Sequence, residues 1–324
     1  MKKATKAWLI AGVSLVIVGM IMFISSMAKY KWDFTELSTE RYETNTYDII
    51  NEKFENLSIS TDTADIVLAL SDDGKCRVVC YEEEKAKHSV TVKNDMLTIE
   101  QTDKKSWYDG IGIDFDSPKI TVYLPQSEYS SLYIDGSVGT VEIPKEFKFK
   151  NAEISLSTSD INFSATASEI IKIETSTGNI NLKSLSAGKL DLSSATGEIT
   201  VSNTVCKGEI KITTNVGVTK LTDIKCENFI SIGYTGDISL SNVCAEGKLS
   251  IERSTGCVNF DKSDAAEISV KTDTGDITGS LLSEKVFVAQ SDTGDVNVPK
   301  TTSGGKCVIN TDNGNVRIEL SGDK

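Results

Sequence analysis

Two copies of the tripeptide Asp-Thr-Gly, at residues 273–275 and 292–294, are the first candidates for chemistry in this chain of 324 residues. Pepsin-like proteases hold their catalytic carboxylates in this tripeptide, and two neighbouring carboxylates can share one proton. In those enzymes the tripeptide is followed by Ser or Thr, and its two copies come from distant parts of the chain. Here Asp276 and Asp295 follow it, and the copies are neighbours in sequence. We therefore interpret both tripeptides as structural.

The tripeptide belongs to a longer period. Eight glycines recur every 19 or 20 residues, at Gly178, Gly197, Gly217, Gly236, Gly256, Gly275, Gly294 and Gly314. The second residue after each glycine is apolar except at Thr219, and the fourth is apolar except at Gly279. Apolar residues also alternate before each glycine. Each repeat is therefore predicted to form a strand, a tight turn and a second strand, with glycine accepting the positive φ of a sharp corner. Threonines before six of the glycines are predicted to stack as one column.

The same frame continues toward the N-terminus, with Ala64, Gly139 and Ser159 in the place of the glycine. One such repeat cannot bury its apolar face alone, whereas stacked repeats build a continuous core. The predicted fold is all-β: a parallel β-helix, or β-solenoid, of about eleven coils of 19–20 residues. An insertion at residues 69–131 breaks the period, and we expect it to form antiparallel hairpins that cover one open end. A propeller built from paired repeats is the alternative.

A charge-free run from Trp8 to Met27 has the length of a membrane-spanning helix. The alternative is a secretory signal peptide, because residues 26–28 would suit a cleavage site. Lysines 2, 3 and 6 favour a cytoplasmic N-terminus. The predicted organisation is a cytoplasmic tail at 1–7, a transmembrane helix at 8–27, a stalk at 28–47 and an extracellular solenoid at 48–324. The predicted location is the cell membrane, with a single pass.

The part of the chain beyond the helix is strongly acidic. Five of the 34 basic residues precede Asp33, which leaves 29 against all 47 acidic residues, a net charge of −18. Such a surface repels nucleic acid and favours cations or basic peptides as partners. It also keeps an extracellular domain soluble, which is the simpler interpretation.

Five aspartates are predicted to gather on neighbouring corners near the C-terminal end of the solenoid. They are Asp273, Asp276, Asp292, Asp295 and Asp312. Several carboxylate oxygens on one edge could bind Ca²⁺. The sequence lacks the nonapeptide calcium repeat, however, so we favour a solvated acidic edge. We expect no other cofactor.

The seven cysteines are an odd number. Cys206, Cys226 and Cys244 have nearly the same phase in three successive repeats and are predicted to form a column. Cys76 and Cys80 share one face of a predicted strand but lie about 13 Å apart, too far to bridge. No zinc-binding spacing is present, so we predict buried thiols that fill the core. Disulfides between stacked neighbours are the alternative.

His88 is the only histidine, which excludes sites that need several imidazoles. A Ser-His-Asp triad needs only one, but His88 lies in the polar stretch EEEKAKHSV and no nucleophile-elbow sequence occurs. His88 is therefore predicted to be a solvated surface residue. The remaining enzymatic alternative is a β-helix that acts on cell-wall or extracellular polysaccharide through acidic side chains. The repeats contain only Arg253 and Arg317 as arginines and few aromatic residues, so we predict a protein that is not an enzyme.

Several segments, in this order, resemble the putative adhesin family, a bacterial cell-surface domain of unknown function. They are NLSISTDTADIVLAL, DMLTIEQ, KITVYLPQSEYSSLYIDGSVGTVEI and the series STGNI, ATGEI, YTGDI, DTGDI and DTGDV, between about residues 47 and 320. The resemblance implies a surface β-solenoid on an N-terminal anchor, with Lia-type relatives linked to envelope stress and antimicrobial peptides. It supplies no catalytic residues. We therefore predict a membrane-anchored extracellular module that binds or senses an envelope component, a protein or a cationic peptide.

Overall fold

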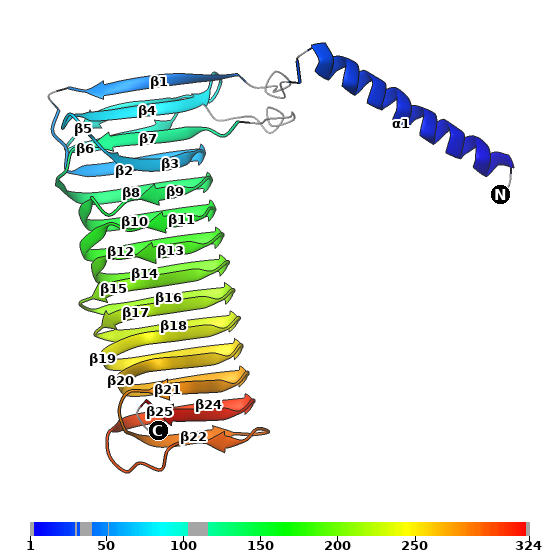
Figure 1. The fold of residues 1–324 in the computed structure, drawn as a ribbon. Coiled ribbons are helices and arrows are strands. Elements are labelled where there is room, and N and C mark those ends of the chain that lie inside the picture. The colour runs from blue at the N-terminus through cyan, green and yellow to red at the C-terminus, as the bar shows by residue number, and fades with distance from the viewer. Residues whose placement is uncertain (1–2, 30, 33–40, 51, 103–115, 322–324) are drawn as a thin grey trace.

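The computed structural model describes residues 3–29, 31–32, 41–50, 52–102 and 116–321. They form one helix, α1 (Lys3–Lys29), and a single sheet of 25 strands wound into a β-solenoid of about ten turns (Figure 1). The predicted all-β solenoid is confirmed. Helix α1 already begins within the predicted tail. The stalk prediction is wrong at its C-terminal end, because residues 42–47 belong to strand β1 (Tyr42–Ile49), which pairs antiparallel with β4 (Cys76–Glu83).

Each coil contributes one strand to each of two columns, and neighbouring strands within a column are parallel. The first column, before the corner, contains β2 (Asn56–Thr63), β8 (Glu128–Val138), β10 (Lys148–Thr158), β12 (Thr166–Thr177), β14 (Ser186–Thr196), β16 (Glu209–Val216), β18 (Asn228–Thr235), β22 (Lys285–Ser291) and β24 (Gly305–Asn313). The second, after the corner, contains β3 (Asp65–Leu70), β9 (Val141–Ile143), β11 (Ile161–Phe163), β13 (Ile180–Lys183), β15 (Ile199–Cys206), β17 (Thr219–Cys226), β21 (Ile277–Leu281), β23 (Val296–Asn297) and β25 (Val316–Leu320). The long strands β19 (Ile238–Thr255) and β20 (Val258–Thr274) each pass through both columns.

The glycines mark corners where stacked coils approach very closely. Gly217 has a φ of 154°, and a Cβ there would lie 1.8 Å from the carbonyl oxygen of Gly197 on the neighbouring coil. Gly197 has the same relation to Gly178, at 2.0 Å. Glycine has no Cβ and so avoids this clash at both positions. Gly139 packs in this way on Ala64, which confirms that both residues share the frame despite the insertion between them.

The residue before the corner is in register from coil to coil. In stacking order the column runs through Thr158, Thr177, Thr196, Val216, Thr235, Thr255, Thr274 and Asn313. The predicted stack of threonines is therefore confirmed over most of the solenoid. The β-branched side chains suit this position because they pack well on a pleated surface.

The residue after the corner forms a ladder of side chain to backbone hydrogen bonds. Asp276 Oδ1 accepts a bond of 2.7 Å from the backbone N–H of Asn315, and Asn315 Oδ1 accepts one of 3.0 Å from the backbone N–H of Asp295. The same bond joins Asp65 to Thr140, Asp160 to Asn179, Asn179 to Glu198 and Asp237 to Cys257. The Asp or Asn that follows each of these corners is thus an acceptor for the next coil, which explains Asp276 after the first Asp-Thr-Gly. Asp295, after the second, lies on the last coil and contributes its backbone N–H to the ladder.

We expect Asp276→Ala to lower the free energy of unfolding by about 1 to 3 kcal/mol, because it leaves the partly buried N–H of Asn315 without an acceptor. Asp276→Asn keeps an acceptor oxygen, so its loss should be well under half as large. Urea unfolding followed by circular dichroism measures both. Equal losses in the two variants would show that the charge, not the acceptor, stabilises this corner.

The insertion covers the N-terminal end of the solenoid, as expected, but only part of it is antiparallel. Strands β6 (Met96–Gln101) and β7 (Lys119–Leu124) pair in parallel with β2 and β3, so KITVYLP extends the solenoid instead of forming a hairpin. Strand β5 (His88–Lys93) pairs antiparallel with β6 through a turn at Asn94 and Asp95, both with positive φ. Strand β4 pairs antiparallel with β7. Strands β5, β4 and β1 therefore form the cap (Figure 1).

At the C-terminal end the last two coils stack in reverse sequence order. Strand β24 pairs with β20 on one side and β22 on the other, so the coil of Gly314 lies between those of Gly275 and Gly294 (Figure 1). The expectation that the two Asp-Thr-Gly corners are adjacent is therefore wrong. They are separated by a whole coil, or about 10 Å at ordinary strand spacing. A shared proton between Asp273 and Asp292 is ruled out by this order.

The interior is a continuous core of alternating apolar side chains that also contains a buried arginine, Arg253. Arg253 is 2% exposed and occupies an inward position before the corner where other coils carry Thr175, Ser194, Thr214 or Thr272. Its guanidinium passes Gly233, where a Cβ would lie 1.6 Å from Nη1. It donates to three hydroxyls, those of Thr214 at 2.9 Å, Ser231 at 2.8 Å and Thr219 at 3.2 Å.

Burial lowers the pKa of Arg253 to about 10, and its buried Nε has no hydrogen-bond partner among the residues that the structure describes. Thr219, which breaks the apolar pattern of the repeat, is thereby explained as a partner of this arginine. On the neighbouring coil, Ser231 accepts a hydrogen bond from the guanidinium, and Gly233 leaves the space that the guanidinium occupies.

Candidate functional site

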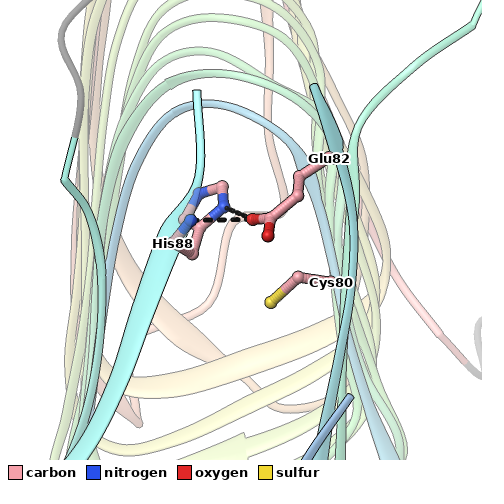
Figure 2. A group of neighbouring side chains, drawn as sticks. All are labelled: Cys80, Glu82 and His88. Carbon is pink, nitrogen blue, oxygen red and sulfur yellow. Dashed lines mark hydrogen bonds and ion pairs between the residues drawn. The ribbon is translucent and has the colours of Figure 1, made fainter. Parts of the chain in front are cut away.

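The cap holds the one cluster of three potential metal-ligating side chains in the described part of the chain. Cys80 and Glu82 lie two residues apart on β4, so they point to the same, inward face, and His88 begins β5 (Figure 2). Cys76 and Val78 occupy the same inward face of β4. Glu82 therefore stands where the strand pattern calls for an apolar side chain. The ligand atoms of Cys80, Glu82 and His88 all lie within 4.8 Å of one another.

The Glu82 carboxylate is fully buried and has three hydrogen-bond donors. Oε2 lies 2.7 Å from His88 Nδ1 and also accepts the backbone N–H of His88 at 2.7 Å. Oε1 accepts a bond of 2.7 Å from Nδ2 of Asn45 on β1. A buried carboxyl group is costly unless it is hydrogen-bonded, and these contacts satisfy both of its oxygens. Strands β1, β4 and β5 together therefore fix its orientation.

The other ring nitrogen of His88 faces the adjacent coil. Nε2 lies 2.9 Å from Oγ1 of Thr61 on β2, and both residues are 4% exposed. The order carboxylate, imidazole and hydroxyl is that of a hydrolase triad. Thr61 does not line the neighbouring cavity, however, and a nucleophile must be reached by its substrate. The geometry is better suited to holding the imidazole in place than to activating Thr61.

A small cavity adjoins the cluster. It has a volume of 160 Å³ and is lined by Asp62, Thr63, Glu83, Ala86, His88, Gln101 and Pro118. It is large enough for several water molecules. His88 belongs to both the cluster and the cavity wall, so the cavity lies directly beside the cluster.

The electrostatics of the cluster keep Cys80 protonated. Burial, and then the nearby Glu82 carboxylate, raise the pKa of the Cys80 thiol to about 12. A reactive cysteine needs the opposite, a positive environment that stabilises the thiolate. Cys80 is therefore not a nucleophile, and its sulfur would lose its proton only to a metal ion.

The prediction that His88 is a solvated surface residue is wrong. The side chain is 2% exposed, and its Nδ1 lies 2.7 Å from Glu82 Oε2, a contact that joins β5 to β4 within the cap. The polar stretch EEEKAKHSV misled the prediction because charged residues usually lie at the surface, whereas Glu82 and Glu83 are buried here together with His88. The spacing of Val78, Cys80 and Glu82 was the usable indication, since period two places Glu82 inward, and an inward carboxylate needs a partner.

The five predicted aspartates do not converge on one point. Asp273, Asp312 and Asp292 follow one another in that stacking order, and Asp273 lies 3.6 Å from Lys271 Nζ. Asp276 and Asp295 lie on the other side of the corner, at either end of the ladder through Asn315. Calcium binding by this edge remains a prediction.

The cysteines are free thiols in the structure, and five of the seven are buried. Cys206 and Cys226 stack as predicted, because Val205 pairs with Lys225. Cys244 is displaced by one residue, since it pairs with Lys225 while Ala245 continues the column. The predicted column of three is therefore a column of two. Cys257 is exposed and does not fill the core.

Helix α1 contains a segment, Trp8–Lys29, that is long and apolar enough to cross a membrane. It thus has the character of an anchor or of a signal peptide, and it precedes the solenoid in the sequence. This architecture defines the class: a repeat-built all-β domain with one N-terminal apolar helix.

The chain matches the family model described as Toastrack DUF4097 over residues 54–215 and again over 207–324. These matches cover more than half of the sequence, so the chain belongs to the Toastrack DUF4097 family. No curated protein matches the chain.

Several solved structures are similar to this chain at low identity. A "putative adhesin" from Parabacteroides distasonis ATCC 8503 is 12% identical with a TM-score of 0.50, and the match covers 84% of this chain and 98% of that one. A "putative lipid binding protein" from the same organism is 15% identical with a TM-score of 0.45, covering 83% and 96%. A "putative adhesin" from Bacteroides fragilis NCTC 9343 is 17% identical with a TM-score of 0.42, covering 86% and 97%. The first of these supports the fold alone.

Proposed function

We propose that this chain is a membrane-anchored β-solenoid displayed outside the bacterial cell, where it binds or senses an envelope component without catalysis. The observation that carries the anchor is the exposure of the apolar side chains of α1 from Trp8 to Ile24. An apolar surface of this extent requires lipid or protein to cover it. Lysines 2, 3 and 6 favour a cytoplasmic N-terminus, which supports an extracellular solenoid.

The charge of the solenoid supports a cationic partner. The net charge of −18 beyond the helix attracts basic peptides over long distances and repels nucleic acid and anionic lipid. A groove of 730 Å³ near the C-terminal end has Glu246 and Glu284 on its walls, and its lysine, Lys285, is paired with Asp264 at 2.6 Å. Within the described ranges neither Glu246 nor Glu284 forms an ion pair, so the groove offers their carboxylates to a basic side chain. A basic antimicrobial peptide, the kind of partner that the sequence resemblance implies, would fit this role.

Cell fractionation tests the anchor. The full chain should stay with the membranes after washing with high salt and with alkaline carbonate, and a variant that lacks residues 1–32 should not. Protease added to intact cells should digest the solenoid. Release of a mature chain that lacks the apolar helix, identified by mass spectrometry, would instead support the signal peptide.

Binding tests separate a binding module from an enzyme. The full chain in detergent should bind polylysine with an affinity that falls as salt rises, because exposed charges are screened. Glu246→Gln with Glu284→Gln should weaken that binding, whereas Asp273→Asn with Asp312→Asn, a matched pair on the corner edge, should weaken it less. New reducing ends after incubation with cell-wall fragments would overturn the non-catalytic function in favour of the polysaccharide enzyme.

A further inference from the structure

The donor atoms of the cap cluster are those of a transition-metal site. Cys80 offers sulfur, His88 a ring nitrogen and Glu82 a carboxylate oxygen, and all three lie within 4.8 Å of one another (Figure 2). Zn²⁺ is bound by these three donor types at about 2.0 to 2.3 Å, which places the ligand atoms of a tetrahedral site somewhat over 3 Å apart. Only small side-chain shifts separate the observed arrangement from that geometry. We propose that Cys80, Glu82 and His88 bind one Zn²⁺ ion or a similar transition-metal ion.

The hydrogen bonds around the cluster have the form of a second shell. A metal-ligating histidine donates its other ring N–H to an oxygen, which fixes the tautomer and the orientation of the ring. His88 Nδ1 faces Glu82, and Nε2 lies 2.9 Å from Thr61 Oγ1. Asn45 holds the other carboxylate oxygen of Glu82. Nδ1 is thus the ligand, and Thr61 and Asn45 are the positioning residues.

The position of Cys80 distinguishes a metal site from a purely structural network. Within the described residues its sulfur makes no hydrogen bond, so the contacts among Glu82, His88, Thr61 and Asn45 are complete without it. A metal ion between Nδ1 and Oε2 would take the place of the proton that these atoms share and would bring the sulfur into the same coordination shell. The thiol proton leaves to solvent as the ion binds, and the neutral imidazole ligand carries its one ring proton on Nε2, which faces Thr61.

The donor set also selects the kind of ion. Ca²⁺ and Mg²⁺ require several oxygen ligands, and the cluster offers one carboxylate. Thiolate and imidazole together favour zinc and related ions. A fourth position remains for water, and the cavity of 160 Å³ lined by His88 provides the route by which water and the ion enter. The site would join β4 to β5 across the cap and close the end of the solenoid.

Metal titration of the full chain in detergent, stripped with a chelator, tests the site. We expect one Zn²⁺ per chain by calorimetry, and Co²⁺ should give the charge-transfer absorption of a thiolate ligand in the near ultraviolet. Cys80→Ser should abolish that absorption. Thr61→Val should keep it but weaken binding by about 10- to 100-fold, as expected for the loss of a second-shell partner. Cys257→Ser, at the exposed cysteine, is the matched control and should change neither result.

Thermal unfolding keeps the test decisive if a variant is unstable. Zn²⁺ should raise the melting temperature of the natural chain, because a ligand that binds only the folded state stabilises it. Cys80→Ser and Cys80→Ala should melt at the same temperature with and without Zn²⁺. Absence of binding by the natural chain would overturn the site, as would Co²⁺ absorption that survives in both Cys80 variants or that disappears in Cys257→Ser.

Discussion

Gly217→Ala is expected to lower the free energy of unfolding by more than about 3 kcal/mol, the upper end for a single strained contact. Its Cβ would lie 1.8 Å from the carbonyl oxygen of Gly197, and φ is 154°. The contact is with backbone, so the two coils must separate before alanine fits. The coil of Gly217 lies between the coils of Gly197 and Gly236, so a shift of this coil disturbs strand pairing on both sides.

Urea unfolding of the full chain measures this effect, and Gly74→Ala is the matched control. Gly74 also has a positive φ, 72°, but an added Cβ there meets nothing within 4 Å. Its substitution should cost only about 1 kcal/mol, from backbone strain alone. Similar losses in the two variants would contradict the close stacking of corners.

Arg253→Ala is expected to lower the free energy of unfolding by about 3 to 5 kcal/mol, the range for truncating a large buried side chain. It leaves space beside Gly233, and it leaves the buried hydroxyls of Thr214 and Ser231 without their donor. Burying the charge of Arg253 opposes folding, because the guanidinium loses its hydration and its Nε has no hydrogen-bond partner among the described residues. The arginine is therefore tolerated only as part of a set with its neighbours.

Returning the whole set to the pattern of the other coils tests that interpretation. The variant combines Arg253→Thr, Gly233→Thr, Ser231→Ile and Thr219→Ile. It should be at least as stable as the natural chain, because replacing a buried charge and its polar partners with well-packed residues is often neutral or stabilising. A loss as large as that of Arg253→Ala would show that the arginine itself stabilises the interior.

The periodic part of the fold could be predicted from sequence because each corner carries its own constraint. A glycine every 19 or 20 residues, with apolar residues two and four positions later, predicts stacked coils. The order of the last two coils could not be predicted in this way. The coils of Gly294 and Gly314 present nearly the same pattern, so either can pair with the coil of Gly275. The same ambiguity hid the parallel strands β6 and β7 inside the insertion.

The candidate site was missed because its residues depart from the repeat instead of continuing it. Glu82 and His88 lie in a polar segment, and their inward direction depends on how β4 and β5 pair with β7 and β6. Thr61 joins them from a coil more than twenty residues earlier. Arg253 is a parallel case: Thr219 was visible as an exception in the sequence, but only stacking connects it to an arginine 34 residues later.

Oxidative crosslinking of paired cysteines tests the stacking of the coils most directly. In a Cys257→Ser background, Thr274→Cys with Asn313→Cys should form a disulfide, because these residues pair in register on β20 and β24. Thr274→Cys with Thr293→Cys should not, because a whole coil lies between them and their Cα atoms exceed the bridging limit of about 7 Å. A bond in the second pair but not in the first would contradict the fold described for the C-terminal end, and bonds in neither would contradict the stacking itself.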